Sequence, residues 1–147
     1  MILVDANLLI YAYDAHSKHH EGSRIWLENA LSSSELVRFA WVTLWAFLRI
    51  STDPRLFERP LSRAEAMTHV SSWLARPSAG ILEPGERHLE ILARVTQVGQ
   101  ATGALVMDAA LAAIAIEHGA TLCTTDRDFA RFPGLKSLNP LESGGVR

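Results

Sequence analysis

The chain has 147 residues, of which 48% are apolar and 20% are charged, with a formal net charge of −2. This length and composition fit one globular domain and exclude a disordered or generally basic protein. They do not exclude a local basic patch that binds nucleic acid. Cys123 is the only cysteine, which excludes an internal disulfide and a cysteine-based zinc site. The sequence lacks a signal-peptide pattern and a membrane-length apolar stretch, so we expect a soluble cytoplasmic protein.

The chain opens with a short apolar run, Ile2 to Val4, that is typical of a buried strand. Asp5 and Asn7 follow directly, so an acid stands at the carboxyl end of a strand, where open α/β sheets bind ligands. A second interpretation is equally open, in which Asp5 only caps the helix or turn that continues through residues 8–13.

The next third of the chain predicts a helix, a strand and a second helix, over residues 19–31, 36–40 and 41–50. The first of these helices is expected to place Ile25, Trp26, Ala30 and Leu31 inward. The second is apolar at almost every position from Trp41 to Ile50. Such a helix needs cover on more than one side, either as a central core helix or through a partner or second copy.

A capping box, Ser62 with Glu65, opens a further helix that is expected to turn Met67 and Val70 inward. The helix is stopped by residues 77–80. A short strand at residues 81–82 and a helix over residues 86–98 follow. The inward face of the helix over residues 86–98 is expected to carry Leu89, Leu92, Ala93 and Thr96.

Residues 105–118 form an alanine- and leucine-rich pattern that strongly favours a helix, and Gly119 is a stop signal. Asp108 lies at the start of this helix. Residues 120–125 predict a buried strand, Asp126 follows it, and a last strand is expected at residues 135–138. The alternation predicts a single α/β domain over residues 1–142, with a mostly parallel sheet of four to five strands and helices on both faces. Residues 143–147 are predicted to be a flexible tail.

Asp5, Asp108 and Asp126 should face one crevice in such a sheet. Two carboxylates about 4 Å apart repel by roughly 4 kcal/mol at an effective dielectric constant of 20, so three of them need a cation or raised pKa values. Mg²⁺ or Mn²⁺ would satisfy them and would favour phosphodiester hydrolysis. Each acid also has a structural alternative, because Asp108 fits a helix N-terminus and Asp126 fits a cap before Phe129.

Two stretches resemble the PIN-domain ribonucleases, and most closely the VapC-type toxins of toxin–antitoxin pairs. ILVDANLLIYAYD is similar to the family's opening strand with its first metal-binding aspartate. MDAALAAIAIEHGATLCTTDRDFARFPGL is similar to its closing half, with two further acids in the expected order. The resemblance covers nearly the whole chain.

The resemblance implies an endoribonuclease in which Asp5 and Asp108 hold Mg²⁺, or Mn²⁺, and Asp126 holds the metal or orients the attacking water. Asn7 and Thr125 match polar positions that line the family's site. Arg49 is a candidate contact for substrate phosphate, and Asp128 is a further acid within reach. The resemblance also implies an RNA substrate and a cognate antitoxin protein. From the sequence itself we expect a homodimer, because the apolar stretch from Trp41 to Ile50 needs cover, and no membrane association.

One position departs from the family pattern. Members usually carry a glutamate shortly before a Leu-Arg pair, and laying Phe47-Leu48-Arg49 on that pattern puts Ala46 at the glutamate's place. The departure raises the question of whether a second metal binds, and it motivates an alternative, a catalytically impaired PIN-fold module that keeps antitoxin binding. A phospho-acceptor signalling domain is a further alternative, disfavoured because Asp5 lacks an acidic neighbour.

Overall fold

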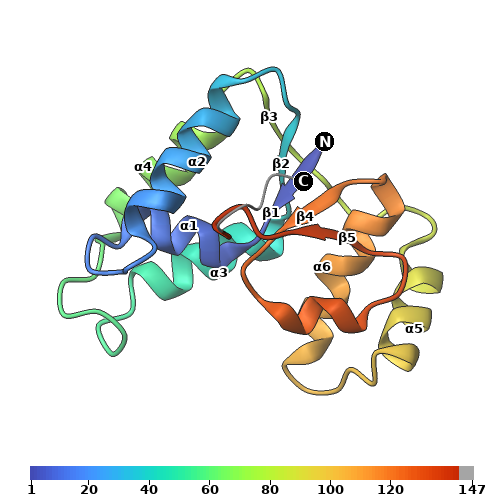
Figure 1. Ribbon diagram of the computed structural model, residues 1–147. Coiled ribbons are helices and arrows are strands. Elements are labelled where there is room, and N and C mark those ends of the chain that lie inside the picture. Colours follow the sequence, from blue (N-terminus) through green and yellow to red (C-terminus); the bar gives the residue numbers. More distant parts are fainter. Residues whose placement is uncertain (143–147) are drawn as a thin grey trace.

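The computed structural model describes residues 1–142, in which short strands alternate with helices (Figure 1). The strands are β1 (Ile2–Val4), β2 (Val37–Phe39), β3 (Ala79–Ile81), β4 (Thr121–Cys123) and β5 (Lys136–Leu138). The helices are α1 (Ala6–Tyr13), α2 (His20–Ser32), α3 (Trp41–Ser51), α4 (Arg63–Leu74), α5 (His88–Val98), α6 (Leu105–His118) and the 3₁₀ helix η1 (Arg127–Arg131). The predicted elements are present with small shifts at their ends, and the predicted tail, residues 143–147, lies outside the described residues.

The five strands form one sheet in the order β3-β2-β1-β4-β5, and all neighbouring strands run parallel. The central strand is β1, where Ile2 pairs with Val37 of β2 on one side and with Thr121 of β4 on the other. The chain first adds β2 and β3 on one side of β1 and later adds β4 and β5 on the other. The strand order therefore reverses between β1 and β4, where an open α/β sheet forms a crevice beyond its carboxyl ends.

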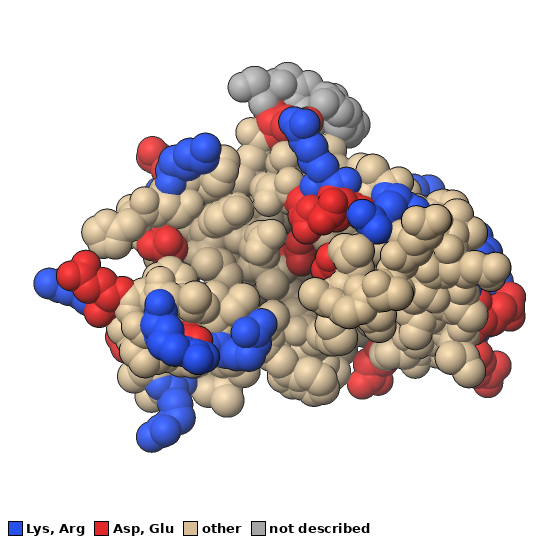
Figure 2. Space-filling model, turned by 90° about the horizontal axis from the view of Figure 1, so that it is seen from below, with Lys and Arg blue, Asp and Glu red and all other residues tan. Residues whose placement is uncertain are grey.

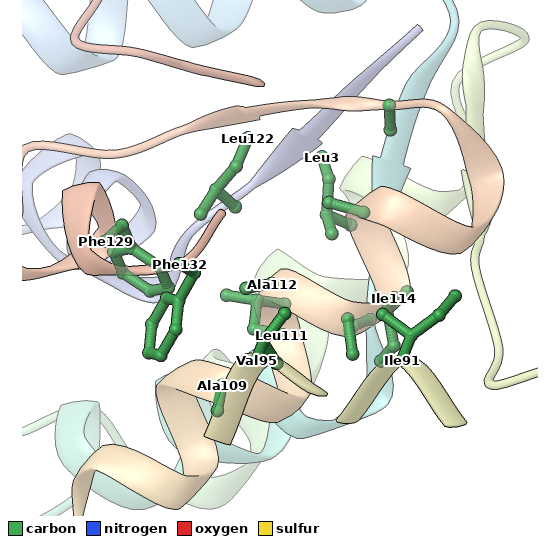
Figure 3. Close-up of a cluster of buried hydrophobic side chains, with 14 of the residues drawn as sticks. Leu3, Ile91, Val95, Ala109, Leu111, Ala112, Ile114, Leu122, Phe129 and Phe132 are labelled. Carbon is green, nitrogen blue, oxygen red and sulfur yellow. The ribbon is translucent and has the colours of Figure 1, made fainter. Parts of the chain in front are cut away.

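Successive residues of β1 serve two separate cores, because strand side chains alternate between the faces of a sheet. Leu3 packs into a core with α5 and α6, whereas Ile2 and Val4 pack into a core with α1 to α4. Figure 1 shows the helices divided in the same way on the two sides of the sheet. The α5–α6 core includes Leu3 and Leu122 of the sheet, with Ile91 and Val95 of α5, Ala109, Leu111, Ala112 and Ile114 of α6, and Phe129 and Phe132 beyond β4 (Figure 3).

An aromatic cluster organises the core on the other face. Phe47 of α3 is fully buried, and its ring lies 4.8 Å from Trp73 of α4 in a T-shaped arrangement. The Tyr13 ring, at the end of α1, packs edge-on against Phe47 at 6.2 Å. Such pairs add about 0.5–1.5 kcal/mol to the area that they bury, so this cluster joins α1, α3 and α4 into one layer.

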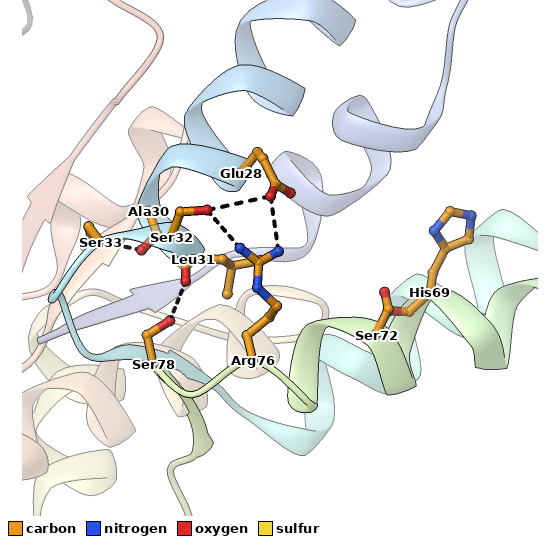
Figure 4. Close-up of polar contacts among 9 residues, drawn as sticks. All are labelled: Glu28, Ala30, Leu31, Ser32, Ser33, His69, Ser72, Arg76 and Ser78. Carbon is orange, nitrogen blue, oxygen red and sulfur yellow. Dashed lines mark hydrogen bonds and ion pairs between the residues drawn. The ribbon is translucent and has the colours of Figure 1, made fainter.

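Polar contacts close the gap between α2 and the end of α4 (Figure 4). The Arg76 guanidinium donates to Glu28 Oε1 at 3.0 Å and to Ser32 Oγ at 2.7 Å. Ser78 Oγ donates to the Leu31 carbonyl at 2.8 Å, which also satisfies an otherwise free carbonyl in the last turn of α2. These contacts hold in place the loop between α4 and β3.

Two local sequence signals are confirmed at helix ends. Ser62 and Glu65 form the reciprocal capping box at the start of α4. Gly119 ends α6 with a φ of 68°, in the left-handed region that favours glycine. Its placement sets the turn that leads directly into β4.

The predicted inward faces of three helices are partly wrong. Ile25, Met67 and Leu89 are exposed to 44%, 56% and 76%. In α2 the buried apolar residues are Leu27 and Leu31, which share a face with a buried serine, and in α5 they are Ile91 and Val95. Ala93 of α5 is exposed, whereas Leu92 and Thr96 are half-buried.

The face of α3 opposite its buried side is open to solvent. Leu44 and Phe47 are fully buried, but Trp41 and Trp45 are exposed to 41% and 62%. Thus α3 is not a central core helix, and the prediction that its remaining cover comes from another chain stays a prediction. Within residues 1–142, no helix has the length and apolar character to cross a membrane.

Candidate active site

Asp5 occupies the first position after β1 and is held from three directions. Its backbone N–H donates to the Cys123 carbonyl of β4 at 3.0 Å. One carboxylate oxygen accepts from the Ala6 backbone N–H at 2.8 Å, and the other accepts from Thr124 Oγ1 at 2.7 Å. Asp5 therefore is the N-cap of α1, as one interpretation predicted, and its 9% exposed side chain also lies at the switch point between β1 and β4.

Asp108 and Asp126 are placed by the two elements that flank β4. Asp108 lies in the first turn of α6, where the N-terminal end of the helix favours negative charge. Asp126 caps η1 by accepting from the Asp128 backbone N–H at 2.8 Å, so its predicted capping role is confirmed. Its own backbone N–H donates to Thr124 Oγ1 at 3.0 Å, which connects the Asp126 turn to Asp5 through one hydroxyl.

These three acids line a single surface pocket of about 260 Å³. The pocket also contains Asn7 from α1, Ala46 and Arg49 from α3, and Met107 from α6. Segments far apart in the sequence therefore meet beyond the carboxyl ends of β1 and β4. Figure 2 shows acidic side chains gathered near the middle of the molecule's lower face, with Lys and Arg side chains on either side.

The carboxylates perturb one another. Burial raises the pKa of Asp5, the Thr124 hydrogen bond opposes that rise, and the nearby Asp126 charge adds to it. Burial, followed by the charges of Asp126 and Asp5, raises the pKa of Asp108 to about 6. The raised pKa of Asp108 therefore reflects burial together with the negative charges of the neighbouring carboxylates.

The further site residues predicted from the sequence, beyond the three acids, do not all line the same cavity. Asn7 and the exposed Arg49 line the acidic pocket together with the three acids. Thr125 lines an adjoining surface cavity of about 320 Å³ that shares Asp126 with the acidic pocket. Asp128 does not line either of these pockets and contributes its backbone N–H to Asp126.

Sequence reasoning missed Thr124. Its side chain is 4% exposed, and its hydroxyl donates to Asp5 while accepting from the Asp126 backbone. The neighbouring Thr125 has the same chemistry, and only the alternation of strand side chains past Leu122 could have favoured Thr124 as the inward residue.

We expect Thr124→Val to raise the pKa of Asp5 further, because the variant removes the hydrogen bond that stabilises its charged form. The variant also leaves the partly buried Asp126 N–H without its acceptor and should lose about 1 kcal/mol of unfolding free energy. NMR titration of the Asp5 carboxyl carbon and urea unfolding measure both effects. Thr124→Ser keeps the hydroxyl and should behave like the parent, and an unchanged Asp5 pKa in Thr124→Val would contradict this role.

The donor set of the pocket fits a hard divalent cation. Asp5, Asp108 and Asp126 supply carboxylate oxygens, the ligands that Mg²⁺ prefers, and their mutual repulsion would be relieved by positive charge. Within residues 1–142, no group of three or more Asp, Glu, His or Cys side chains is arranged closely enough to hold a metal ion. Mg²⁺ is usually held by one or two carboxylates and keeps several waters, so its binding does not require such a group.

We expect the metal-free protein to gain stability at neutral pH when Asp108 is replaced by asparagine. The folded-state pKa of Asp108 is raised from 3.8 to about 6, so the folded protein retains a proton that the unfolded chain releases. Its contribution to stability is therefore present below about pH 4 and is lost as the pH rises to about 6. Solvent screening reduces the effect to about 1 kcal/mol.

Urea unfolding of the parent and of Asp108→Asn in EDTA, from pH 4 to pH 7, measures this difference. The two proteins should have similar unfolding free energies at pH 4, and the variant should be the more stable one at pH 7. A difference that does not change with pH would show that Asp108 does not carry the raised pKa.

Comparison with known proteins places this site in a family. Residues 2–135 match the PIN domain family. Ribonuclease VapC37 of Mycobacterium tuberculosis is 52% identical over 142 residues, which are 95% of this chain and 97% of the relative. Ribonuclease VapC31 of the same species is 36% identical over 140 residues, 95% of this chain and 99% of the relative.

Two solved structures share the fold at low sequence identity. VapBC2 from Rickettsia felis, bound to a DNA fragment from its promoter, has a TM-score of 0.67 at 20% identity, covering 93% of this chain and 97% of that one. FitAB bound to an IR36 DNA fragment has a TM-score of 0.70 at 18% identity, and both chains are covered completely. At these sequence identities the likeness shows a shared fold alone.

Proposed function

This chain belongs to the VapC ribonucleases of the PIN-domain family, and from that membership we propose that it is a metal-dependent endoribonuclease, the toxin of a type II toxin–antitoxin pair. One observation carries the catalytic part of the proposal. Three carboxylates from separate parts of the chain line one pocket at the switch point of the sheet. The ribonuclease relatives give no support to the alternative of a phospho-acceptor signalling domain.

Asp5 and Asp108 would hold Mg²⁺, or Mn²⁺, together with Asp126 and water. When bound, the ion supplies positive charge that polarises a phosphate oxygen and makes a water molecule more acidic. Thr124 and the Ala6 N–H hold the Asp5 carboxylate in one orientation through their hydrogen bonds. A ligand held in this way pays little ordering cost when the ion binds.

The remaining pocket residues act on the RNA. Asn7 is the second residue of α1, two positions after Asp5, and its amide can donate to a phosphate oxygen. Arg49 lies exposed at the same pocket and can pair with phosphate through its planar guanidinium. Asp126 would orient the attacking water and accept its proton as the water oxygen bonds to phosphorus. The bond from phosphorus to one sugar oxygen breaks, and that oxygen takes a proton from solvent. The products are one RNA end with a phosphate and one with a hydroxyl.

The proposal includes an antitoxin, a second copy of the chain and a cytoplasmic location. A cognate antitoxin would block the pocket, and the structural relatives include VapBC complexes. A second copy of the chain would cover the exposed Trp41 and Trp45 of α3. The RNA substrate would be met in the cytoplasm. Sedimentation of the parent and of Trp45→Ala tests the dimer, and a monomeric parent at all concentrations would overturn it.

Cleavage of total cellular RNA by purified, antitoxin-free protein tests the catalytic proposal. Discrete cuts should occur with Mg²⁺ or Mn²⁺ and disappear with EDTA, and sequencing of the cut ends identifies the target. The opposite outcome would be folded protein that leaves RNA intact with either metal. If Ala46→Glu, which adds a carboxylate to the pocket lining, then creates cleavage, the parent chain is a binding module.

A further inference from the structure

A third cavity, of about 440 Å³, lies at the far end of α1 from the acidic pocket. It is formed where the loop after α1 meets the loop after α3, and its lining is Tyr13, Asp14, Ala15, His16, Phe57, Glu58 and Arg59. Helix α1 joins the two sites, because it starts beside Asp5 and ends at Tyr13. Eight residues of helix separate them by about 12 Å, within reach of one short RNA segment.

The wall of this cavity is aromatic and fixed in place. The Tyr13 and Phe57 rings meet edge-to-face with centroids 5.8 Å apart. Tyr13 is also packed against the buried Phe47 at 6.2 Å, so its ring is anchored to the core. Aromatic rings held at a surface cavity are the groups on which unpaired nucleic-acid bases stack.

The rim of the cavity carries carboxylate and guanidinium groups with hydrogen-bonding atoms that have no partner within residues 1–142. The side chains of Glu58 and Arg59 are exposed and make no hydrogen bond or ion pair within residues 1–142. Asp14 uses one carboxylate oxygen to accept from the His16 backbone N–H at 3.1 Å, which leaves its second oxygen available. The cavity thus offers acceptors on two carboxylates and a donor fork on one guanidinium.

We propose that this cavity binds an unpaired guanine base of the RNA substrate, an inference that rests on the proposed ribonuclease function. Guanine carries two adjacent donors, N1–H and the N2 amino group, that match the two oxygens of one carboxylate. Its O6 and N7 acceptors match an arginine fork. The base stacks on the aromatic wall while Glu58 pairs with the donor edge and Arg59 with the acceptor edge, and the second oxygen of Asp14 adds a further acceptor at the rim.

The same groups discriminate against other occupants. Adenine and cytosine lack adjacent ring N–H and amino donors, and uracil has a single N–H donor, so none of them satisfies a carboxylate as fully. An arginine side chain from a protein partner would suit the two carboxylates and the aromatic rings, but it would meet the like charge of Arg59. The charge pattern therefore favours a base with both donors and acceptors.

NMR titration of ¹⁵N-labelled protein in EDTA tests this binding without cleavage. We expect GMP to shift the amide signals of Tyr13, Phe57 and Arg59, and IMP, which lacks the N2 amino group, to bind about tenfold more weakly. The double variant Asp14→Asn with Glu58→Gln should lose the difference between GMP and IMP. Glu90→Gln, an exposed change of the same kind on α5, should keep it.

Equal binding of GMP and IMP would overturn the guanine assignment, and so would tighter binding of an arginine amide at the same residues. A separate arm compares the cut sites that the parent and the double variant make in total RNA with Mg²⁺. Cuts by both proteins with the same base preference would overturn the cavity's role and leave the nuclease intact. An absence of cuts by the parent would instead overturn the proposed function.

Discussion

RNA cleavage should fall by roughly 10²–10³-fold when Asp5 is replaced by asparagine, the range seen when one group that stabilises transition-state charge is removed. Asparagine has nearly the same shape, and its side-chain oxygen can still accept from the Ala6 N–H, so the cap of α1 is kept. The variant loses the negative charge that a divalent ion needs. Because burial raises the pKa of Asp5, removing its charge should not destabilise the metal-free fold at neutral pH.

Cleavage assays on matched amounts of parent, Asp5→Asn and Asp108→Asn measure this loss, with thermal unfolding as the check of the fold. Asp53→Asn is the control, since Asp53 pairs with Arg55 and does not line the acidic pocket. It should cut RNA at the parent rate. Full activity in Asp5→Asn would remove this carboxylate from the proposed mechanism.

The largest loss of stability is expected for Phe47→Ala. The Phe47 side chain is fully buried and contacts the rings of Tyr13, His69 and Trp73, so its removal opens a cavity where α1, α3 and α4 meet. Such substitutions cost about 3–5 kcal/mol, a large fraction of the 5–15 kcal/mol that holds an ordinary domain together. We expect Tm to drop by roughly 10 °C or more.

Guanidinium unfolding monitored by fluorescence measures this loss. Leu56→Ala provides the control, because Leu56 is 58% exposed and its truncation should change the unfolding free energy by less than about 0.5 kcal/mol. A loss of less than about 1 kcal/mol for Phe47→Ala would mean that the aromatic cluster does not connect the three helices.

The order of strands and helices could be predicted because the chain alternates short buried runs with clear helix signals. The capping box at Ser62 and the stop at Gly119 are local features, so the sequence is enough to place them. The inward face of α5 could not be predicted in the same way. Leu89 and Leu92 compete with Ile91 and Val95 for the core, and only the packing of α5 against α6 decides between them.

Only part of the candidate site could be predicted from the sequence. The meeting of Asp5 and Asp126 could be predicted because the carboxyl ends of parallel strands meet at one edge of a sheet, and both residues line one pocket. The role of Thr124 could not, because a contact between residues 119 positions apart depends on the pairing of β4 with β1. The cavity at Tyr13 and Phe57 also depends on how two loops meet, which no local pattern encodes.

The central position of β1 has a consequence for protein synthesis. Asp5 is synthesised well before its partners Thr124 and Asp126, which follow β4. A product of interrupted translation that ends before residue 121 would contain β1, β2 and β3 and would lack both the neighbouring strand and two of the site residues. We therefore expect such a product to lack the complete acidic pocket, and with it the proposed RNA cleavage.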